Sequence, residues 1–290
     1  MRYQIKHITE YTYQELVNTA HNRLCLVPLN LPEQKCLSSN IKVLPVPDEQ
    51  EYRTDFFGNT LYFVSIYKEH NKLEVISESL IDVLPRIQSG IAAESKLLWE
   101  NVKTTIAQHD EYGEIAQYLL PSHYVPYSVE IQKFAEDCFA QGDTLWNASN
   151  ALMKKIFTSL EFKPGFTTVN TPVETVVKLK KGVCQDFAHL MIACLRNQGV
   201  AARYVSGYLE TFPPPGKEKL VGSDASHAWV AVYFPGIGWV EFDPTNNLQP
   251  ADNHIIVAFG RDYFDVAPIK GIIFSSGTQQ VDVKVDVTRV

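Results

Sequence analysis

KGVCQDFAHLMIACLR, residues 181–196, predicts a turn that leads into a helix with Cys184 in its first turn. Apolar side chains recur at helical spacing after Cys184 and form one stripe, which consists of Phe187, Leu190, Met191, Cys194 and Leu195. Gly199 is expected to end the helix, because glycine readily adopts the left-handed conformation of a C-terminal cap. The pattern therefore predicts a packed helix that carries a cysteine at its N-terminal end.

The N-terminal end of a helix is a favourable place for a reactive cysteine. The unpaired N–H groups and the positive end of the helix dipole favour a thiolate over a thiol at Cys184. The same N–H groups can stabilise the oxyanion that forms when sulfur attacks a carbonyl. Most cysteines, however, are small buried hydrophobic residues. The catalytic interpretation therefore requires a base and a group that orients the base.

The composition is that of a soluble protein. The chain has 290 residues, enough for two domains, with 45% hydrophobic residues and a net charge of −7. The negative charge argues against a nucleic-acid partner, and no run reaches the ~18 apolar residues of a membrane span. The first residues lack an apolar signal segment, and the five cysteines are too scattered for a disulfide framework. We therefore expect a reduced, cytoplasmic protein without a membrane partner, and the sequence predicts no oligomeric state.

No metal site is predicted. Three histidines of the first part of the chain lack metal-ligand spacing: His7, His21 and His70. Four aspartates near the end lack the tight spacing of a calcium loop: Asp224, Asp252, Asp262 and Asp265.

Short strands fill the first part of the chain. Alternating runs at residues 3–8 and 61–67, separated by proline-rich turns, predict an all-β, sandwich-like domain over residues 1–90. Pro85 marks the boundary. Residues 91–290 are expected to form a second domain of helices and strands, with the C-terminal strands able to pack back on the first domain. The predicted fold class is α+β.

The second domain begins with helices. Start signals predict a helix over residues 128–140 capped by Ser128, a second helix capped by Asp143, and a short third helix with Thr171 as its cap and Pro172 at its first position.

After Gly199 the apolar period changes from helical to alternating, which indicates strands. The predicted strands cover residues 202–209, 227–233, 239–243, 255–259 and 281–287. A polar, proline-rich loop from Pro213 to Ser223 separates the first two.

A hairpin of two of these strands supplies the base and the orienting group. It brings His227, at the start of one strand, near Asp243, at the end of the next. If Tyr233 pairs with Trp239, both side chains share a face and are diagonal neighbours, with backbones ~7–8 Å apart. If Phe234 pairs with Trp239 instead, Asp243 points away from His227.

The ordered motifs of the chain resemble the bacterial transglutaminase-like family of the papain-like cysteine protease and transglutaminase superfamily. The motifs are GVCQDFA (182–188), RYVSGY (203–208), HAWV (227–230), GWVEFDPTN (238–246) and GRDY (260–263). Residues 23–28 and DFFGN (55–59) resemble the N-terminal β-domain of the family, so the resemblance covers nearly the whole chain. Ala231 is a departure, since relatives often carry Glu there, and it affects only a secondary contact near the site.

The resemblance implies a papain-like core in which the cysteine helix packs on an antiparallel sheet. It implies Cys184 as the nucleophile, His227 as the general base and later acid, and Asp243 as the group that fixes the imidazole. The reaction would be attack on an amide carbonyl, release of an amine and a thioester on Cys184, without a cofactor. The Cys184 backbone N–H would be one oxyanion donor, and the sequence does not identify the second.

Three activities stay open. Water as the acceptor gives a peptidase, an amidase or a glutamine deamidase, and a lysine amine gives transglutamination. The third is a non-catalytic binding protein on the same fold. A protein or a peptide is the expected partner of the enzyme.

Residues beside the motifs are weaker candidates. Tyr208 and Trp229 are candidates for substrate binding, although such residues are more typical of the core. His189 lies about 140° around the helix from the cysteine, which favours a packed or solvated role. Asp186 adjoins the cysteine motif, and two roles stay open for it: contact with the site or a structural hydrogen bond.

Overall fold

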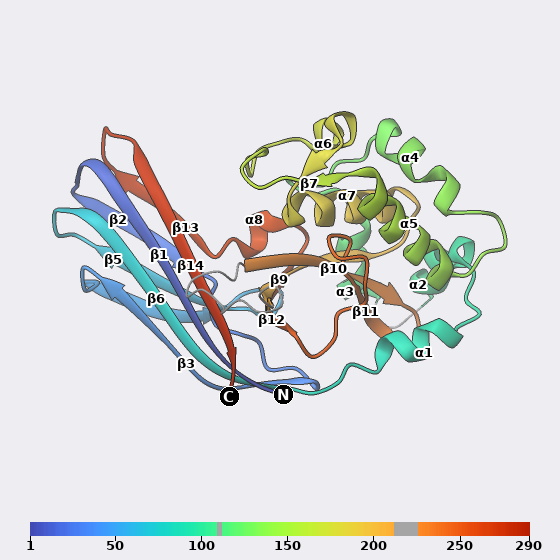
Figure 1. The fold of residues 1–290 in the computed structure, drawn as a ribbon, viewed down its shortest axis with the longest axis horizontal. Helices are drawn as coiled ribbons and strands as arrows, with labels where there is room; N and C mark the ends of the chain where they lie inside the picture. Colours follow the sequence, from blue (N-terminus) through green and yellow to red (C-terminus); the bar gives the residue numbers. More distant parts are fainter. Residues whose placement is uncertain (109–111, 212–225) are drawn as a thin grey trace, which may run out of the picture.

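The computed structural model describes residues 1–108, 112–211 and 226–290. An all-β half of two sheets lies at one side. At the other side lies a half in which helices cover another antiparallel sheet (Figure 1). The predicted α+β fold class is confirmed. Within the described ranges, the structure contains no helix that is both long and apolar enough to cross a membrane.

Two four-stranded antiparallel sheets form the all-β half, with strand orders β14-β1-β6-β3 and β13-β2-β5-β4. Side chains from both sheets, among them Leu24, Val43, Tyr62 and Val75, pack in a common core between the sheets. The first six strands are β1 (Arg2–Val17), β2 (Thr19–Leu24), β3 (Gln34–Leu44), β4 (Glu49–Thr54), β5 (Thr60–Ile66) and β6 (His70–Val83).

The last two strands of the chain complete these sheets. β13 (Ile269–Phe274) pairs with β2, and β14 (Gln279–Arg289) pairs with β1 along most of its length (Figure 1). The region predicted as the second domain, residues 91–290, therefore includes two strands that belong to the all-β half.

Helices follow the first six strands and cover one face of the sheet formed by β9 to β12 (Figure 1). The helix predicted over residues 128–140 is a shorter α-helix that continues as a 3-10 turn. The segments before the cysteine helix are α1 (Gln88–Glu94), η1 (Trp99–Asn101), α2 (Val102–Ala107), α3 (Tyr112–Ile115), η2 (Ala116–Leu119), α4 (Val129–Ala135), η3 (Glu136–Cys138), α5 (Leu145–Ser159) and α6 (Val173–Leu179).

Two helix starts differ by one residue from the prediction. Thr144, not Asp143, caps α5, because the Thr144 hydroxyl accepts the Asn147 backbone N–H at 3.2 Å. Pro172, not Thr171, is the N-cap of α6. A cap residue has extended backbone angles, and proline is compatible with them.

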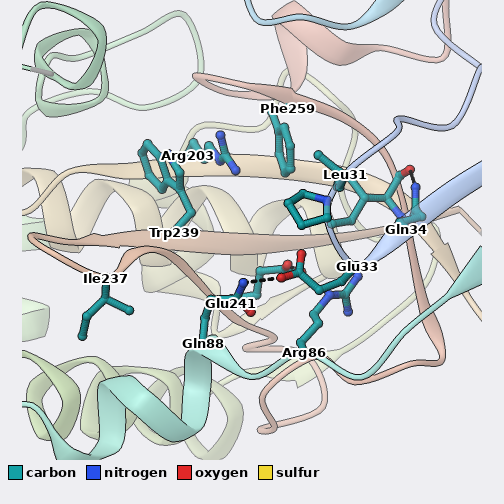
Figure 2. A pocket seen from close by; sticks show the side chains of 12 residues that line it. Leu31, Glu33, Gln34, Arg86, Gln88, Arg203, Ile237, Trp239, Glu241 and Phe259 are labelled. Carbon is teal, nitrogen blue, oxygen red and sulfur yellow. Dashed lines mark hydrogen bonds and ion pairs between the residues drawn. The ribbon is translucent and has the colours of Figure 1, made fainter.

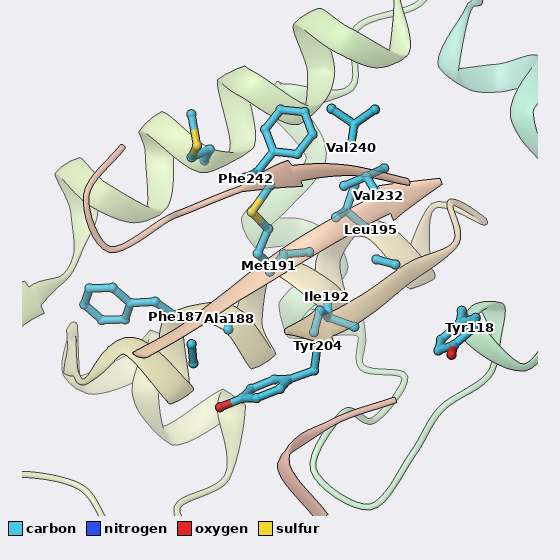
Figure 3. Close-up of a cluster of buried hydrophobic side chains, with 14 of the residues drawn as sticks. Tyr118, Phe187, Ala188, Met191, Ile192, Leu195, Tyr204, Val232, Val240 and Phe242 are labelled. Carbon is cyan, nitrogen blue, oxygen red and sulfur yellow. The ribbon is translucent and has the colours of Figure 1, made fainter. Parts of the chain in front are cut away.

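The third four-stranded sheet has the order β11-β10-β9-β12 and supports the cysteine helix α7 (Cys184–Asn197). The apolar stripe of α7, including Phe187, Met191 and Leu195, packs with Val232 and Phe242 of the sheet (Figure 3). Gly199 follows the helix with φ +77°, as its predicted role in termination requires. The remaining segments are β7 (Glu161–Phe162), β8 (Lys181–Gly182), β9 (Ala202–Leu209), β10 (Ser226–Phe234), β11 (Gly238–Phe242), β12 (His254–Gly260) and α8 (Tyr263–Val266).

Candidate active site

Asp186 anchors the start of α7. Its carboxylate accepts the Val183 backbone N–H at 2.8 Å and the Thr167 hydroxyl at 2.6 Å. Gly182 gives this carboxylate room, because a Cβ at Gly182 would lie only 2.8 Å from an Asp186 oxygen. Of the two roles left open for Asp186, the structure thus shows the structural hydrogen bond. These contacts fix Cys184 as the first residue of the helix, where it is partly buried.

The hairpin of β10 and β11 has the register that brings His227 and Asp243 together. Tyr233 pairs with Trp239, and the ladder runs to Val230 opposite Phe242, just before Asp243. His227 Nε2 lies 2.8 Å from Asp243 Oδ2, and both side chains are almost fully buried. The predicted pairing of the two groups is confirmed.

Asp243 is held as an acceptor on both of its oxygens. Oδ1 accepts the backbone N–H groups of Thr245 and Asn246 at 2.9 and 3.2 Å. Oδ2 accepts the Asn246 side-chain amide at 2.7 Å in addition to His227. Since the carboxylate is fully buried, these donors take the place of water and keep it ionised.

Cys184 lies close enough to the His227 imidazole to raise the pKa of that ring through a hydrogen bond and its charge. Since Asp243 occupies Nε2, the ring has its Nδ1 left for the sulfur. The structure therefore brings Cys184, His227 and Asp243 together, in the order sulfur, imidazole, carboxylate.

The charges of His227 and Asp243 stabilise each other. Burial on its own lowers the pKa of His227, but the hydrogen bonds and charges of Asp243 and Cys184 outweigh it and raise that pKa to about 10. Burial also raises the pKa of Asp243, yet its hydrogen bonds from His227 and His254 hold that pKa well below its ordinary value. The imidazole is thus expected to be positively charged at neutral pH.

His254 is a residue of the site that the sequence did not reveal. It begins β12, is fully buried, and its Nε2 lies 3.2 Å from the Asp243 oxygen that also binds His227. No motif or spacing connects His254 with the catalytic residues, because the loop that joins Asp243 to β12 has no regular pattern. Asn246 belongs to the motif that follows β11, but its bonds to Asp243 were not predicted either.

His227, Asp243 and His254 form a group in which one atom of each lies within 4.8 Å of the others. Such a group has the residue types of a metal site. Here the Nε2 atoms of both histidines contact one carboxylate oxygen, the arrangement in which each histidine donates an N–H to Asp243. We interpret the group as a hydrogen-bonded cluster around Asp243.

The two residues predicted as weak candidates for substrate binding are packed in the interior. Trp229 is fully buried, stacks on His227 at 5.8 Å between ring centroids, and donates its indole N–H to Glu241 at 2.6 Å. Tyr208 is buried, and its hydroxyl lies 2.8 Å from His7 Nδ1. The polar atoms of both side chains are thus occupied by partners inside the protein, and both side chains are buried in this structure.

Two neighbours of Cys184 on α7 are also structural. His189 is buried, and its Nε2 accepts the Tyr263 backbone N–H at 3.1 Å. Burial lowers the pKa of His189 to about 4, so it is neutral at physiological pH. Cys194 is fully buried in the apolar stripe. The predicted loop from Pro213 to Ser223, and Asp224, lie outside the described residues.

A cavity of about 180 Å³ lies beside Glu241, the carboxylate that accepts the indole N–H of Trp229 (Figure 2). The Arg203 guanidinium stacks between Trp239 and Phe259 at its edge, 4.2 and 3.5 Å from the two ring centroids. Arg86 lies 3.3 Å from Glu241 in the same cavity. The cavity does not include Cys184, His227 or Asp243 in its lining, so it is separate from the candidate active site.

Comparisons with known proteins identify relatives of both halves of the chain. Residues 132–244 match the core of the transglutaminase-like superfamily, and residues 3–82 match the bacterial transglutaminase-like N-terminal region. An uncharacterized protein of Mycobacterium tuberculosis is 36% identical over 99% of this chain and 92% of its own length. A protein-glutamine gamma-glutamyltransferase of Pseudomonas aeruginosa is 26% identical over 52% of this chain and 20% of its own length.

A solved structure has the same fold over the whole chain. The crystal structure of a "putative cysteine protease" from Cytophaga hutchinsonii covers 100% of this chain and 91% of its own, with a TM-score of 0.77 and 22% identity. The arrangement of the N-terminal sandwich and the helix-covered sheet is thus shared as a unit. Together, the matched core, the matched N-terminal region and the full-length relative show that the chain belongs to the transglutaminase-like superfamily, in the group with a bacterial transglutaminase-like N-terminal region.

Proposed function

We propose that the chain is a cysteine-dependent acyl-transfer enzyme that acts on amide bonds of a protein or peptide. Cys184 is the nucleophile, His227 the general base and acid, and Asp243 the carboxylate that orients the imidazole. The observation that carries the proposal is the position of His227, which bonds Asp243 through Nε2 at 2.8 Å and has the Cys184 thiol as a second partner.

The first half of the reaction forms a thioester. The Cys184 sulfur attacks the amide carbonyl carbon, and the carbonyl oxygen becomes an oxyanion beside the Cys184 backbone N–H at the start of α7. The C–N bond then breaks, and the His227 imidazolium gives its proton to the departing amine. Asp243 keeps the ring in the correct tautomer throughout, because Nε2–H stays bound to the carboxylate.

The second half transfers the acyl group. A water molecule or a primary amine attacks the thioester while neutral His227 removes its proton, and the C–S bond breaks to return the thiolate. Water yields an acid, as in a peptidase, an amidase or a deamidase, and a lysine amine yields a new amide. The glutamyltransferase relative supports the second outcome and the cysteine protease fold supports the first. Both outcomes use the same three residues.

A pair of single substitutions tests the proposal. Cys184→Ala removes the sulfur at a helix end and leaves a small change in volume, so we expect loss of turnover with an almost unchanged fold. Cys36→Ala is the matched control, because Cys36 is also partly exposed but lies in the N-terminal sheet. The substrates to screen are peptides, glutamine-containing proteins and glutamyl amides, with release of ammonia or of a new amine as the readout.

Labelled cadaverine separates the two outcomes. If an amine is the acceptor, the label enters the substrate in a Cys184-dependent manner, because a bound amine reacts with the thioester faster than water does. If water is the acceptor, hydrolysis continues and little label is incorporated. Turnover that persists in Cys184→Ala, or a screen in which no acyl transfer depends on Cys184, would favour a binding protein on this fold.

A further inference from the structure

The donors that hold Asp243 have two different origins. Three N–H groups come from Thr245 and Asn246, two and three residues further along the same turn, so they move together with the carboxylate. Within the described part of the chain, the two remaining donors belong to the sheet: His227 on β10 and His254 on β12. Since His227 is the group to be oriented, His254 is the partner that fixes Asp243 relative to the sheet.

His254 is itself held firmly. The Arg86 guanidinium donates to the backbone carbonyls of His254 and Ala251 at 2.7 and 2.6 Å. Arg86 also faces Glu241 (Figure 2). Glu241 in turn accepts the indole N–H of Trp229. The imidazole of His254 is fully buried, and its ring meets that of Trp229 edge to face, with centroids 5.2 Å apart. Because His254 is fixed in this way, it can hold Asp243 at a defined position relative to the sheet.

The charges around Asp243 determine which histidine is protonated on both nitrogens. The rings of His227 and His254 are 5.9 Å apart between centroids, so two imidazolium ions would repel each other across a single carboxylate. Burial lowers the pKa of His254, its bond to Asp243 opposes this, and the charges of His227 and Arg86 lower the pKa further. His227, beside Cys184 and Asp243, has its pKa raised to about 10. His227 therefore carries the positive charge, and His254 is neutral.

A neutral His254 has one proton to donate. Its Nε2 contacts Asp243, an acceptor, so the proton lies on Nε2 and Nδ1 is an acceptor. Nδ1 lies 2.9 Å from the Asn253 side-chain oxygen Oδ1, which can only accept a hydrogen bond. The Nε2–H tautomer of a neutral His254 therefore requires the Asn253 amide to be turned by about 180°, so that its N–H faces Nδ1.

We propose that His254 is a positioning residue of this site, which donates its Nε2–H to Asp243 and so holds the carboxylate where it fixes the His227 imidazole beside Cys184. The inference rests on the proposed function only where it gives the fixed His227 imidazole a role in catalysis. Its central statement concerns the resting protein, and that can be measured without a substrate.

Three substitutions of His254 distinguish the effect of losing its N–H donor from the effect of losing its ring. His254→Gln keeps an N–H near the position of Nε2, His254→Phe keeps a ring without a donor, and His254→Asn has an amide that is too short to reach Asp243. The pKa of His227 is measured by NMR titration of histidine-labelled protein, and a His227→Gln spectrum assigns its signal. The rate of Cys184 alkylation by iodoacetamide is measured at neutral pH, and urea unfolding checks the fold of each variant.

Loss of the donor should weaken the hold of Asp243 on His227. In His254→Phe and His254→Asn we expect the titration of His227 to move down by about one pH unit, the size of a lost hydrogen bond to a charged group. Alkylation of Cys184 at neutral pH should stay within about threefold of the wild type, because His227 remains protonated there. His254→Gln should keep the titration of His227 within about 0.3 pH unit of the wild type. If one donor-free variant fails to fold, the other is compared with His254→Gln.

An unchanged or upward titration of His227 in a folded variant without the donor would overturn the positioning role. So would equal behaviour of His254→Gln and His254→Asn, or unfolding of all three variants, which would indicate a purely structural residue. Failure to find any substrate would count against the proposed enzyme function but would leave these titrations and their interpretation intact.

Discussion

Tyr233 lies opposite Trp239 in the hairpin of β10 and β11, with their ring centroids 5.4 Å apart. This pairing sets the register of both strands and places the side chains of His227 and Asp243 on the same face, where they form a 2.8 Å contact. Because side chains alternate along a strand, a slip by one residue would turn Asp243 to the opposite face. A local feature of the turn thus decides whether the imidazole has a carboxylate partner.

The charge of Asp243 is expected to be necessary for activity. Asp243→Asn keeps the shape of the side chain but removes the charge that holds His227 protonated and in one tautomer, so kcat/KM should fall about 10³- to 10⁴-fold. Asp282→Asn, on the exposed strand β14, is the control and should leave activity within about twofold. A loss of less than about tenfold in Asp243→Asn would argue against this role.

Cys184 should be the first cysteine to react with iodoacetamide at neutral pH. It is partly exposed and contacts the His227 imidazole, while burial raises the pKa of Cys25 to about 12 and that of Cys138 to about 11. We expect Cys184 to be alkylated at least about tenfold faster than the other four cysteines, as measured by mass spectrometry of the digested protein. In His227→Gln this preference should disappear. Equal labelling of all five would indicate that no activated sulfur exists.

The raised pKa of His227 predicts that stability falls at alkaline pH. A group whose pKa rises on folding stabilises the protein fully below its unfolded value, near 6.5, and this contribution is lost as pH rises through about 10. Between pH 7 and 10 the free energy of unfolding should therefore fall by about 1.5–3 kcal/mol more in the wild type than in His227→Gln. Urea unfolding across this range measures the difference.

His21→Gln provides the control for this experiment, since His21 is exposed on β2, far from the site in the chain. It should follow the wild type at every pH. If the wild type and His227→Gln lose stability in parallel, the hydrogen-bonded charge of His227 does not contribute in the way described.

Gly182 is expected to be required for the correct start of α7. A Cβ at this position would lie 2.8 Å from the Asp186 oxygen and 2.9 Å from the Asp186 Cβ, so Gly182→Ala should lower the free energy of unfolding by about 1–3 kcal/mol and slow the alkylation of Cys184. Gly90→Ala, in helix α1 with no atom within 4 Å of the added Cβ, should stabilise the protein by about 0.5–1 kcal/mol. Equal effects of the two substitutions would contradict the close approach to Asp186.

Much of the fold was predictable because each element carries its own periodic pattern. The stripe from Phe187 to Leu195 identified α7, and the alternation after Gly199 gave the strand Ala202–Leu209 with its observed bounds. Caps were less predictable. Asp143 and Thr144 are adjacent residues that can both cap a helix, and only the bond from Asn147 N–H to Thr144 identifies the cap.

The site was predictable where its residues belong to regular elements. His227 and Asp243 lie at the ends of two strands of one hairpin, so their meeting follows from a register that the sequence restricts to two choices. His254 was not predictable, because a loop without a period connects it to Asp243, and its contact depends on the path of that loop. Likewise, the buried positions of Tyr208 and Trp229 depend on partners distant in the chain, such as His7.

An acyl group bound to Cys184 would be the most direct evidence for the proposed thioester mechanism. The wild-type protein is incubated with a glutamine-containing peptide or an amide substrate, quenched in acid, and digested, and the peptide that contains Cys184 is weighed by mass spectrometry. We predict an added acyl mass on Cys184, absent from Cys184→Ala and strongly reduced in His227→Gln, that disappears when water or an amine is given time to react. An adduct that forms equally in His227→Gln, or turnover of a substrate without any acyl mass on Cys184, would contradict the proposed thioester mechanism.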